Sequence, residues 1–262
     1  MTIQTSLAQS DPTGRAWLDR LKNAVIDLLF PPHCAVCHRP GAWLCAECLS
    51  EIEVIHPPVC LRCGLPANGS LPADARPPVC KHCEGTSQQL DGLRSFAYHS
   101  GPLRHAIHQF KYQDLRSLAG PLGKLMGDGW FGLAPQNLDL DVIVSVPLHP
   151  TRLRQRGFNQ SALLARELGA SLQWPVSENG LIRTRATTPQ VELGAQERRA
   201  NVHNAFRCTG TGLSGQRVLL VDDVCSTGST LNSACMALRE ADASLVWAYT
   251  LARARPGPPE LR

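Results

Sequence analysis

Four Cys-x-x-Cys pairs lie within fifty residues of this 262-residue chain, and they constrain its fold more than any other feature. Each pair can present two thiolates from one tight turn, so two pairs complete a tetrahedral shell around Zn2+. Intervals of seven and sixteen residues separate the pairs within two successive sets, whereas a crossed arrangement needs gaps of 22 and 31. We therefore predict two sequential zinc sites, with the crossed pairing as the alternative. Their predicted ligands are Cys34, Cys37, Cys45, Cys48 and Cys60, Cys63, Cys80, Cys83.

The segment that contains these pairs, residues 31–88, is rich in cysteine and proline and shows no helix-length apolar pattern. Such a segment buries too little apolar area to order itself, so we expect the metal to supply the missing stability. Four thiolates leave no coordination position open for water, which predicts structural rather than catalytic zinc. Redox-active dithiols or an iron–sulfur cluster are the alternative uses of the thiolates.

The rest of the composition indicates a folded protein of a reducing compartment. Apolar residues make up 43% of the chain, but no run of eighteen predicts a membrane span. The first residues lack the basic-then-apolar layout of a secretory signal. We therefore expect a cytoplasmic protein, in which paired cysteines hold metal more often than they form disulfides. The sequence leaves the oligomeric state open.

Apolar strands alternate with helical segments from residue 89 to residue 252. This pattern predicts an α/β domain in which helices flank a parallel sheet. We expect a tail with an amphipathic helix at 1–30 to precede the cysteine module, and a flexible tail at 253–262. The predicted strands are 93–98, 141–146, 180–183, 218–221 and 245–251, and the predicted helices are 102–110, 115–126, 159–172 and 230–240.

Residues 218–230 (VLLVDDVCSTGST) are the most informative part of the α/β region. An apolar strand ends at two aspartates, and a loop of small residues then opens into a helix. Ligands of open parallel sheets bind at the carboxyl ends of the strands. Backbone N–H groups of the loop and the helix N-terminus form an anion cradle suited to a phosphate monoester. The predicted cradle residues are Ser226, Thr227, Gly228, Ser229 and Thr230.

The two aspartates, Asp222 and Asp223, indicate what else this site binds. Carboxylates beside a phosphate repel it unless they face a donor or a cation, such as vicinal ribose hydroxyls or a bound Mg2+. The segment therefore predicts a site for a sugar with a phosphate on one side and a diol on the other. An acid pair after an apolar strand also occurs in receiver domains and ordinary loops, but the full pattern is more specific.

Residues 218–230 resemble the thirteen-residue signature of type I phosphoribosyltransferases, which bind phosphoribosyl pyrophosphate (PRPP). Further motifs are similar to the succession that marks the ComF family, in which a zinc ribbon precedes a phosphoribosyltransferase domain. They are FKY at 110–112, VPLH at 146–149, RQRGFNQ at 154–160, TPQ at 188–190, RRANV at 198–202 and AF at 205–206. The resemblance covers roughly residues 17–252. It implies a phosphoribosyltransferase-like sheet behind a double zinc ribbon, and a link to natural transformation, the uptake of DNA by bacteria.

The resemblance also implies roles for individual residues. Asp222 and Asp223 would hold the ribose hydroxyls, residues 226–230 the 5-phosphate, and the turn from 147 to 152 the pyrophosphate with its Mg2+. Residues 184–204 match a mobile loop that closes over the substrate. The turn contributes His149 and Arg152, the loop region Arg183, Gln190 and Arg198, and the charge-neutralising groups are Lys111, Arg154 and Arg156. Asp223 is the candidate base toward the attacking nucleophile.

Two functions from different classes agree with these residues. In the first, a transferase attaches ribose 5-phosphate to an unknown acceptor and releases pyrophosphate. In the second, the pocket senses PRPP or a nucleotide without catalysis, and the protein binds single-stranded DNA and competence proteins. Nine arginines and four glutamates between residues 147 and 207 suit phosphate recognition in either case. An aromatic content of 5% argues against a long base-stacking platform.

Overall fold

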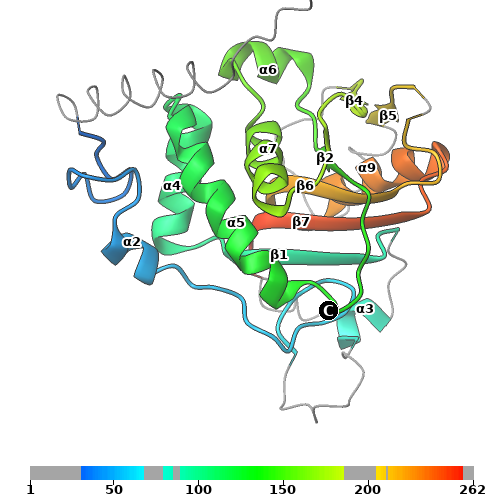
Figure 1. The fold of residues 1–262 in the computed structure, drawn as a ribbon, viewed down its shortest axis with the longest axis horizontal. Coiled ribbons are helices and arrows are strands. Elements are labelled where there is room, and N and C mark those ends of the chain that lie inside the picture. Colours follow the sequence, from blue (N-terminus) through cyan, green and yellow to red (C-terminus); the bar gives the residue numbers. More distant parts are fainter. Residues whose placement is uncertain (1–30, 68–78, 85–88, 186–204, 211, 256–262) are drawn as a thin grey trace, which may run out of the picture.

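The computed structural model describes residues 31–67, 79–84, 89–185, 205–210 and 212–255. The predicted tail and amphipathic helix at 1–30 and most of the predicted mobile loop, including Gln190 and Arg198, lie outside these residues. A five-stranded parallel sheet forms the centre of the molecule, as the sequence predicts (Figure 1). Its strands are, in spatial order, β1 (Gly92–Tyr98), β7 (Leu245–Arg253), β6 (Arg217–Cys225), β2 (Val142–Ser145) and β3 (Val176–Ser177).

Helices cover both faces of this sheet because its strands are apolar on both sides. On β6, Leu219 and Val221 pack into one core, whereas Val218 and Leu220 pack into the other. The first core is closed by α4 (Gly101–Tyr112), α5 (Ala119–Leu133) and α7 (Gln160–Leu172), and the second by α9 (Ser229–Glu240) (Figure 1). A 3-10 turn, Arg116–Leu118, precedes α5. Continuous apolar runs, rather than alternating ones, are what a doubly covered parallel sheet requires.

Several elements differ from the predicted ones. β6 continues through Asp222 and Asp223 to Cys225, and β7 runs to Arg253, the first residue of the predicted tail. Polar residues end an apolar run in the sequence, but backbone pairing between these two strands carries both past that point. A short helix, α6 (Pro150–Arg156), replaces the predicted turn, and β4 (Leu181–Arg183) pairs antiparallel with β5 (Phe206–Cys208) outside the main sheet.

The cysteine module contains two short helices, α2 (Ala46–Ser50) and α3 (Lys81–Glu84), and it covers the free edge of β1. Val54 forms an antiparallel bridge with Ala97, and the amide of Ile55 donates to the Phe96 carbonyl at 2.9 Å. The edge strand of the sheet is therefore hydrogen-bonded to the module along its length, which removes an exposed strand edge. No helix among the described residues is long and apolar enough to cross a membrane.

Candidate functional site

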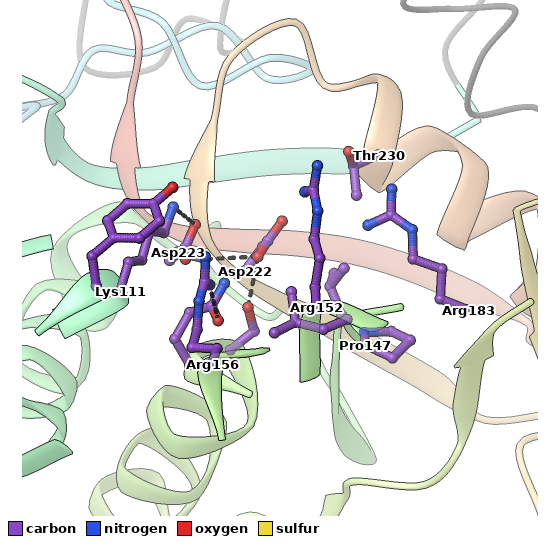
Figure 2. Close-up of a pocket in the computed structure, with 13 residues that line it drawn as sticks. Lys111, Pro147, Arg152, Arg156, Arg183, Asp222, Asp223 and Thr230 are labelled. Carbon is purple, nitrogen blue, oxygen red and sulfur yellow. Dashed lines mark hydrogen bonds and ion pairs between the residues drawn. The ribbon is translucent and has the colours of Figure 1, made fainter. Parts of the chain in front are cut away.

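A polar cavity of about 180 Å³ lies beyond the carboxyl end of β2 and beside the last residues of β6. Side chains from α4, α6, α7, β4 and α9 complete its walls (Figure 2). Its lining residues are Lys111, Tyr112, Val146, Pro147, Leu148, Arg152, Arg156, Gln160, Ser161, Arg183, Asp222, Asp223 and Thr230. The position agrees with the rule that open parallel sheets bind ligands at the carboxyl ends of their strands.

The two aspartates on the cavity floor are held differently. Asp222 Oδ1 accepts hydrogen bonds from Ser161 Oγ at 2.7 Å and from the Asp223 amide at 2.9 Å. Asp223 Oδ1 pairs with Lys111 Nζ at 2.8 Å, and its side chain is only 5% exposed. Asp223 Oδ2 is buried and has no hydrogen-bond partner among the described residues. A buried acceptor without a donor is destabilising, so this oxygen favours a ligand that brings a hydroxyl group or a cation.

The environment raises the pKa of the Asp222 carboxyl above its ordinary value. Burial is the largest cause and the neighbouring Asp223 charge the second, while the Ser161 hydrogen bond and the Lys111 charge act in the opposite direction. The Asp222 carboxyl therefore ionises less readily than an ordinary aspartate.

Cations outnumber carboxylates around the cavity. Four lining side chains are cationic and two are carboxylates. Arg156 lies with its guanidinium 5.2 Å from the centre of the Tyr112 ring and donates to Gln160 Oε1. Arg183 is 8% exposed and stacks on Phe206. Forked, permanently charged arginines suit phosphate and pyrophosphate oxygens better than they suit a neutral ligand.

The predicted phosphate cradle connects β6 to α9. Gly228 has a φ of 79° and is the N-cap of the twelve-residue helix α9, a left-handed conformation that favours glycine. Thr227 Oγ1 and Ser229 Oγ lie 2.7 Å apart, so the loop folds back on itself at the helix N-terminus. Thr230 is the cradle residue that reaches the cavity wall. A helix N-terminus behind hydroxyl groups is a suitable anion site.

The structure does not bring every predicted residue to the cavity. Because residues 150–156 form a helix, Arg152 and Arg156 share one face, and Arg154 is exposed on another. His149 is the N-cap of this helix, and its Nδ1 accepts from the Thr151 amide at 3.3 Å. Neither Arg154 nor His149 lines the cavity.

Arg183 belongs to β4 and already lines the cavity, so its assignment to the mobile loop is corrected. Sequence reasoning missed Ser161 and Tyr112 as site residues. Tyr112 follows Lys111 and Ser161 follows Gln160 within or beside recognised motifs, and that adjacency is the signal that could have found them.

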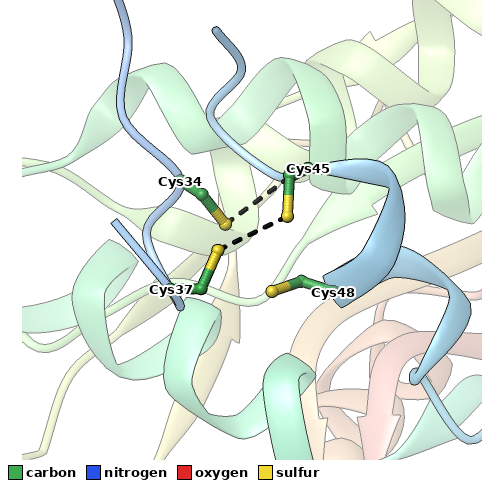
Figure 3. A group of neighbouring side chains, drawn as sticks. All are labelled: Cys34, Cys37, Cys45 and Cys48. Atoms are coloured by element: carbon green, nitrogen blue, oxygen red, sulfur yellow. Dashed lines mark hydrogen bonds between the residues drawn. The ribbon is translucent and has the colours of Figure 1, made fainter. Parts of the chain in front are cut away.

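The eight paired cysteines form two clusters with the sequential pairing that the spacing predicts. Within each cluster the four Sγ atoms all lie within 4.8 Å of one another, and Cys37 and Cys45 approach to 3.5 Å (Figure 3). In the second cluster, Cys63 Sγ and Cys80 Sγ are 3.7 Å apart. Zinc bonded to four sulfurs at about 2.3 Å places those sulfurs at about 3.8 Å from each other, so both clusters fit a tetrahedral zinc ion.

In each cluster, hydrogen bonds from backbone N–H groups lower the pKa of one cysteine thiol. Although burial alone would raise it, hydrogen bonds from backbone N–H groups lower the pKa of Cys34 to about 6. Burial would also raise the pKa of Cys60, but hydrogen bonds from backbone N–H groups outweigh it and lower this pKa to about 7. Thiolates rather than thiols bind zinc, so these donors favour metal binding.

Comparison with known domain families agrees with this architecture. Residues 25–84 match the double zinc ribbon domain, and residues 160–261 match the phosphoribosyl transferase domain. The fold and the site thus define a protein that joins a double zinc ribbon to a phosphoribosyltransferase domain.

Relatives that match over most of their length identify the family within this class of proteins. The DNA utilization protein YhgH of Escherichia coli K12 is 34% identical over 233 residues, which cover 86% of this chain and 99% of the relative. Competence protein F of Haemophilus influenzae is 33% identical over 80% of this chain and 90% of its own. Competence protein ComFC of Bacillus subtilis is 25% identical over 82% of this chain and 86% of its own length. The chain belongs to the ComF family.

Solved structures with a similar fold share less of the chain. A glutamine PRPP amidotransferase from B. subtilis, complexed with ADP and GMP, has a TM-score of 0.35 and 24% identity. The matched region covers 52% of this chain and 26% of the amidotransferase chain. A hypoxanthine phosphoribosyl transferase from Trypanosoma cruzi has a TM-score of 0.34 and 18% identity, and covers 57% of this chain and 69% of its own.

Proposed function

We propose that the cavity binds PRPP with Mg2+ and that the protein transfers ribose 5-phosphate to an acceptor with release of pyrophosphate. The observation that supports this most is Asp223 Oδ2, a buried acceptor without a partner among the described residues, in a cavity whose other walls are cationic. A ligand with hydroxyl donors at one end and phosphates at the others satisfies both features. A neutral ligand, or a simple polyphosphate, satisfies only one of them.

In this proposal, the carboxylates of Asp222 and Asp223 accept the ribose hydroxyls. The cradle from Ser226 to Thr230 binds the 5-phosphate, and Arg152 with Arg156 binds the pyrophosphate. Bound Mg2+ would neutralise part of the pyrophosphate charge. The ion pair with Lys111 fixes the Asp223 carboxylate in place, so that its second oxygen faces the ligand as an acceptor.

The reaction is a substitution at the anomeric carbon. The bond to the pyrophosphate oxygen breaks, its electron pair leaves with pyrophosphate, and a nitrogen of the acceptor forms the new bond. The acceptor nitrogen then loses its proton, for which Asp223 is the candidate base. Cationic side chains aimed at the leaving group stabilise its developing negative charge. Names of relatives that refer to DNA utilization and competence support a role of this activity in DNA uptake.

Calorimetric titration of the zinc-loaded protein with Mg2+ and PRPP tests the proposal, with pyrophosphate release assayed against a panel of nucleobases. We expect binding that weakens at least tenfold in Asp223→Asn, because the amide replaces one acceptor oxygen with a donor. Asp128→Asn, which alters an exposed carboxylate on α5, is the matched control. Equal PRPP affinity in Asp223→Asn and the wild type would refute the site. Binding without base-dependent release would refute transfer to a free base and favour the sensor function.

A second function, nucleic-acid binding, is favoured by the exposed face of α4. This helix contains no acidic residue, and Arg104, His108 and Tyr112 follow one another along its solvent side toward the cavity mouth. Tyr112 is 64% exposed, and Arg156 and His108 lie against its ring, so an aromatic surface and a cation lie side by side there. We expect Arg104→Ala with His108→Ala to weaken the binding of labelled single-stranded DNA and to reduce its salt dependence. An unchanged salt dependence would refute this surface.

A further inference from the structure

Arg94 of β1 is a buried cation whose surroundings contain no carboxylate partner among the described residues. Its side chain lies in the interior with the residue 3% exposed, packed 4.9 Å from the centre of the Trp247 ring. No ion pair joins it to an aspartate or glutamate in the described part of the chain, whereas eight other cationic side chains there have such partners. A buried charge without a counter-charge is strongly destabilising, so something else must balance it.

The groups that Arg94 contacts indicate what balances it. Nη1 donates to the carbonyl oxygens of Leu93 at 2.8 Å, Leu61 at 3.0 Å and Cys60 at 3.3 Å, and Cys60 belongs to the second cysteine cluster. Nε donates to the carbonyl of Leu133, the last residue of α5, at 2.8 Å. The carboxyl end of a helix supplies only about half a negative charge. Four thiolates around one Zn2+ carry a net charge of −2, and Cys60, whose carbonyl accepts from Arg94, is one of these four ligands.

The turn from Cys60 to Cys63, which supplies two ligands of this cluster, is also packed closely against β1. Leu93 donates its amide to the Arg62 carbonyl at 2.9 Å. Gly64 has a φ of 68°, and a Cβ atom at this position would lie 2.4 Å from the Leu93 carbonyl oxygen. These contacts join the Cys60–Cys63 turn of the second cluster directly to the backbone of β1 next to Arg94.

We propose that Arg94 is the buried counter-cation of the second zinc centre, and that it couples zinc binding at Cys60, Cys63, Cys80 and Cys83 to the folding of the transferase sheet. The ribbon and the sheet are then one folding unit rather than two independent domains. Zinc stabilises the buried guanidinium, and the guanidinium in turn raises the zinc affinity of this centre relative to the first one. The inference concerns folding and metal binding, so it stands or falls independently of the proposed transfer reaction.

Zinc release from the full-length, zinc-loaded protein to a chromogenic chelator tests this coupling. Arg94→Met keeps an unbranched apolar stem, although a shorter one, and removes the charge, and Arg94→Lys keeps the charge without the guanidinium fork. Arg217→Met is the matched control, because Arg217 starts the neighbouring strand β6 and pairs with Asp139 and Asp141 instead of a cysteine cluster.

We expect Arg94→Met to release one of two zinc ions at a chelator concentration at least tenfold lower than the wild type. Arg94→Lys should lie between the two, and Arg217→Met should release both ions as the wild type does. Release from Arg94→Met that matches the wild type would overturn the proposal. Equal release from Arg94→Lys and Arg94→Met would also overturn it, because hydrogen bonds rather than charge would then act. If Arg94→Met does not fold, Arg94→Gln takes its place, because it removes the charge and keeps N–H donors. Wild-type release from Arg94→Gln would then overturn the proposal, and earlier release of one ion would support it.

Discussion

Replacement of Lys111 by methionine is the perturbation whose magnitude follows most directly from the structure. Lys111 Nζ lies 2.8 Å from Asp223 Oδ1, and the two side chains are 19% and 5% exposed. Removal of one partner from a buried ion pair costs about 3–5 kcal/mol, because the remaining charge stays buried and unpaired. Since Lys111 retains some solvent contact, we expect the lower end, about 3 kcal/mol. This corresponds to a melting temperature about 6–12 °C below that of the wild type.

The loss should depend on pH in a defined direction. The pKa of Asp222 is already raised by burial and by the Asp223 charge, and the Lys111 charge opposes that rise. Without Lys111 the pKa rises further, so the folded state holds a proton that the unfolded state releases. Stability therefore falls as pH increases from the ordinary carboxyl pKa to the raised one. The difference between Lys111→Met and the wild type should be smallest near pH 4 and should grow toward pH 8.

Urea unfolding followed by tryptophan fluorescence at several pH values measures both effects. Lys124→Met is the control, because Lys124 pairs with Asp128 at 2.7 Å on the surface, with side chains 73% and 59% exposed. It should change stability by less than about 1 kcal/mol. A second change, Asp223→Asn in the Lys111→Met background, should restore much of the loss. The reasoning is refuted if Lys111→Met matches the surface control at pH 7, or if its deficit shrinks as pH rises.

Three further predictions follow from the same structure. Gly228→Val forces a β-branched residue to a φ of 79° and should destabilise the protein by about 1–2 kcal/mol and weaken PRPP binding. Gly212→Val, at a position with open space around it, is the control. Equal stability of the two variants would contradict the prediction that the left-handed backbone at Gly228 requires glycine. Gly64→Ala should lower the melting temperature because its Cβ would meet the Leu93 carbonyl at 2.4 Å, and wild-type melting would show that the turn from Cys60 to Cys63 can move. Metal analysis should find two zinc ions per chain, and their removal by a chelator should unfold the ribbon, seen as loss of the thermal transition. A folded protein with much less than one zinc per chain would contradict the structural role.

The local chemistry of this protein could be predicted from its sequence. The cysteine spacing predicts two sequential clusters, because each pair is a turn of four residues and the shortest connections join neighbours. The strand, loop and helix of residues 218–230 are also local, since apolar residues, small residues and a helix start follow in order. Strand ends were predicted less well: β6 and β7 continue past their apolar runs because they pair with each other, and single-strand patterns do not show that pairing.

The sequence by itself therefore determined the metal clusters and the strand, loop and helix of residues 218–230, because residues close together in the chain form them. Its succession of apolar runs and motifs also indicated the parallel sheet and the family. Only the tertiary structure decided that Lys111 pairs with Asp223 and that Arg183 lines the cavity. It also placed Arg94 against the second cluster, and it showed that Arg154 lies on another face of α6 from Arg152. These contacts join residues far apart in sequence or on opposite sides of a helix. They are fixed by the packing of the two cores and by helix geometry, because many weak interactions act together there and no short segment contains them.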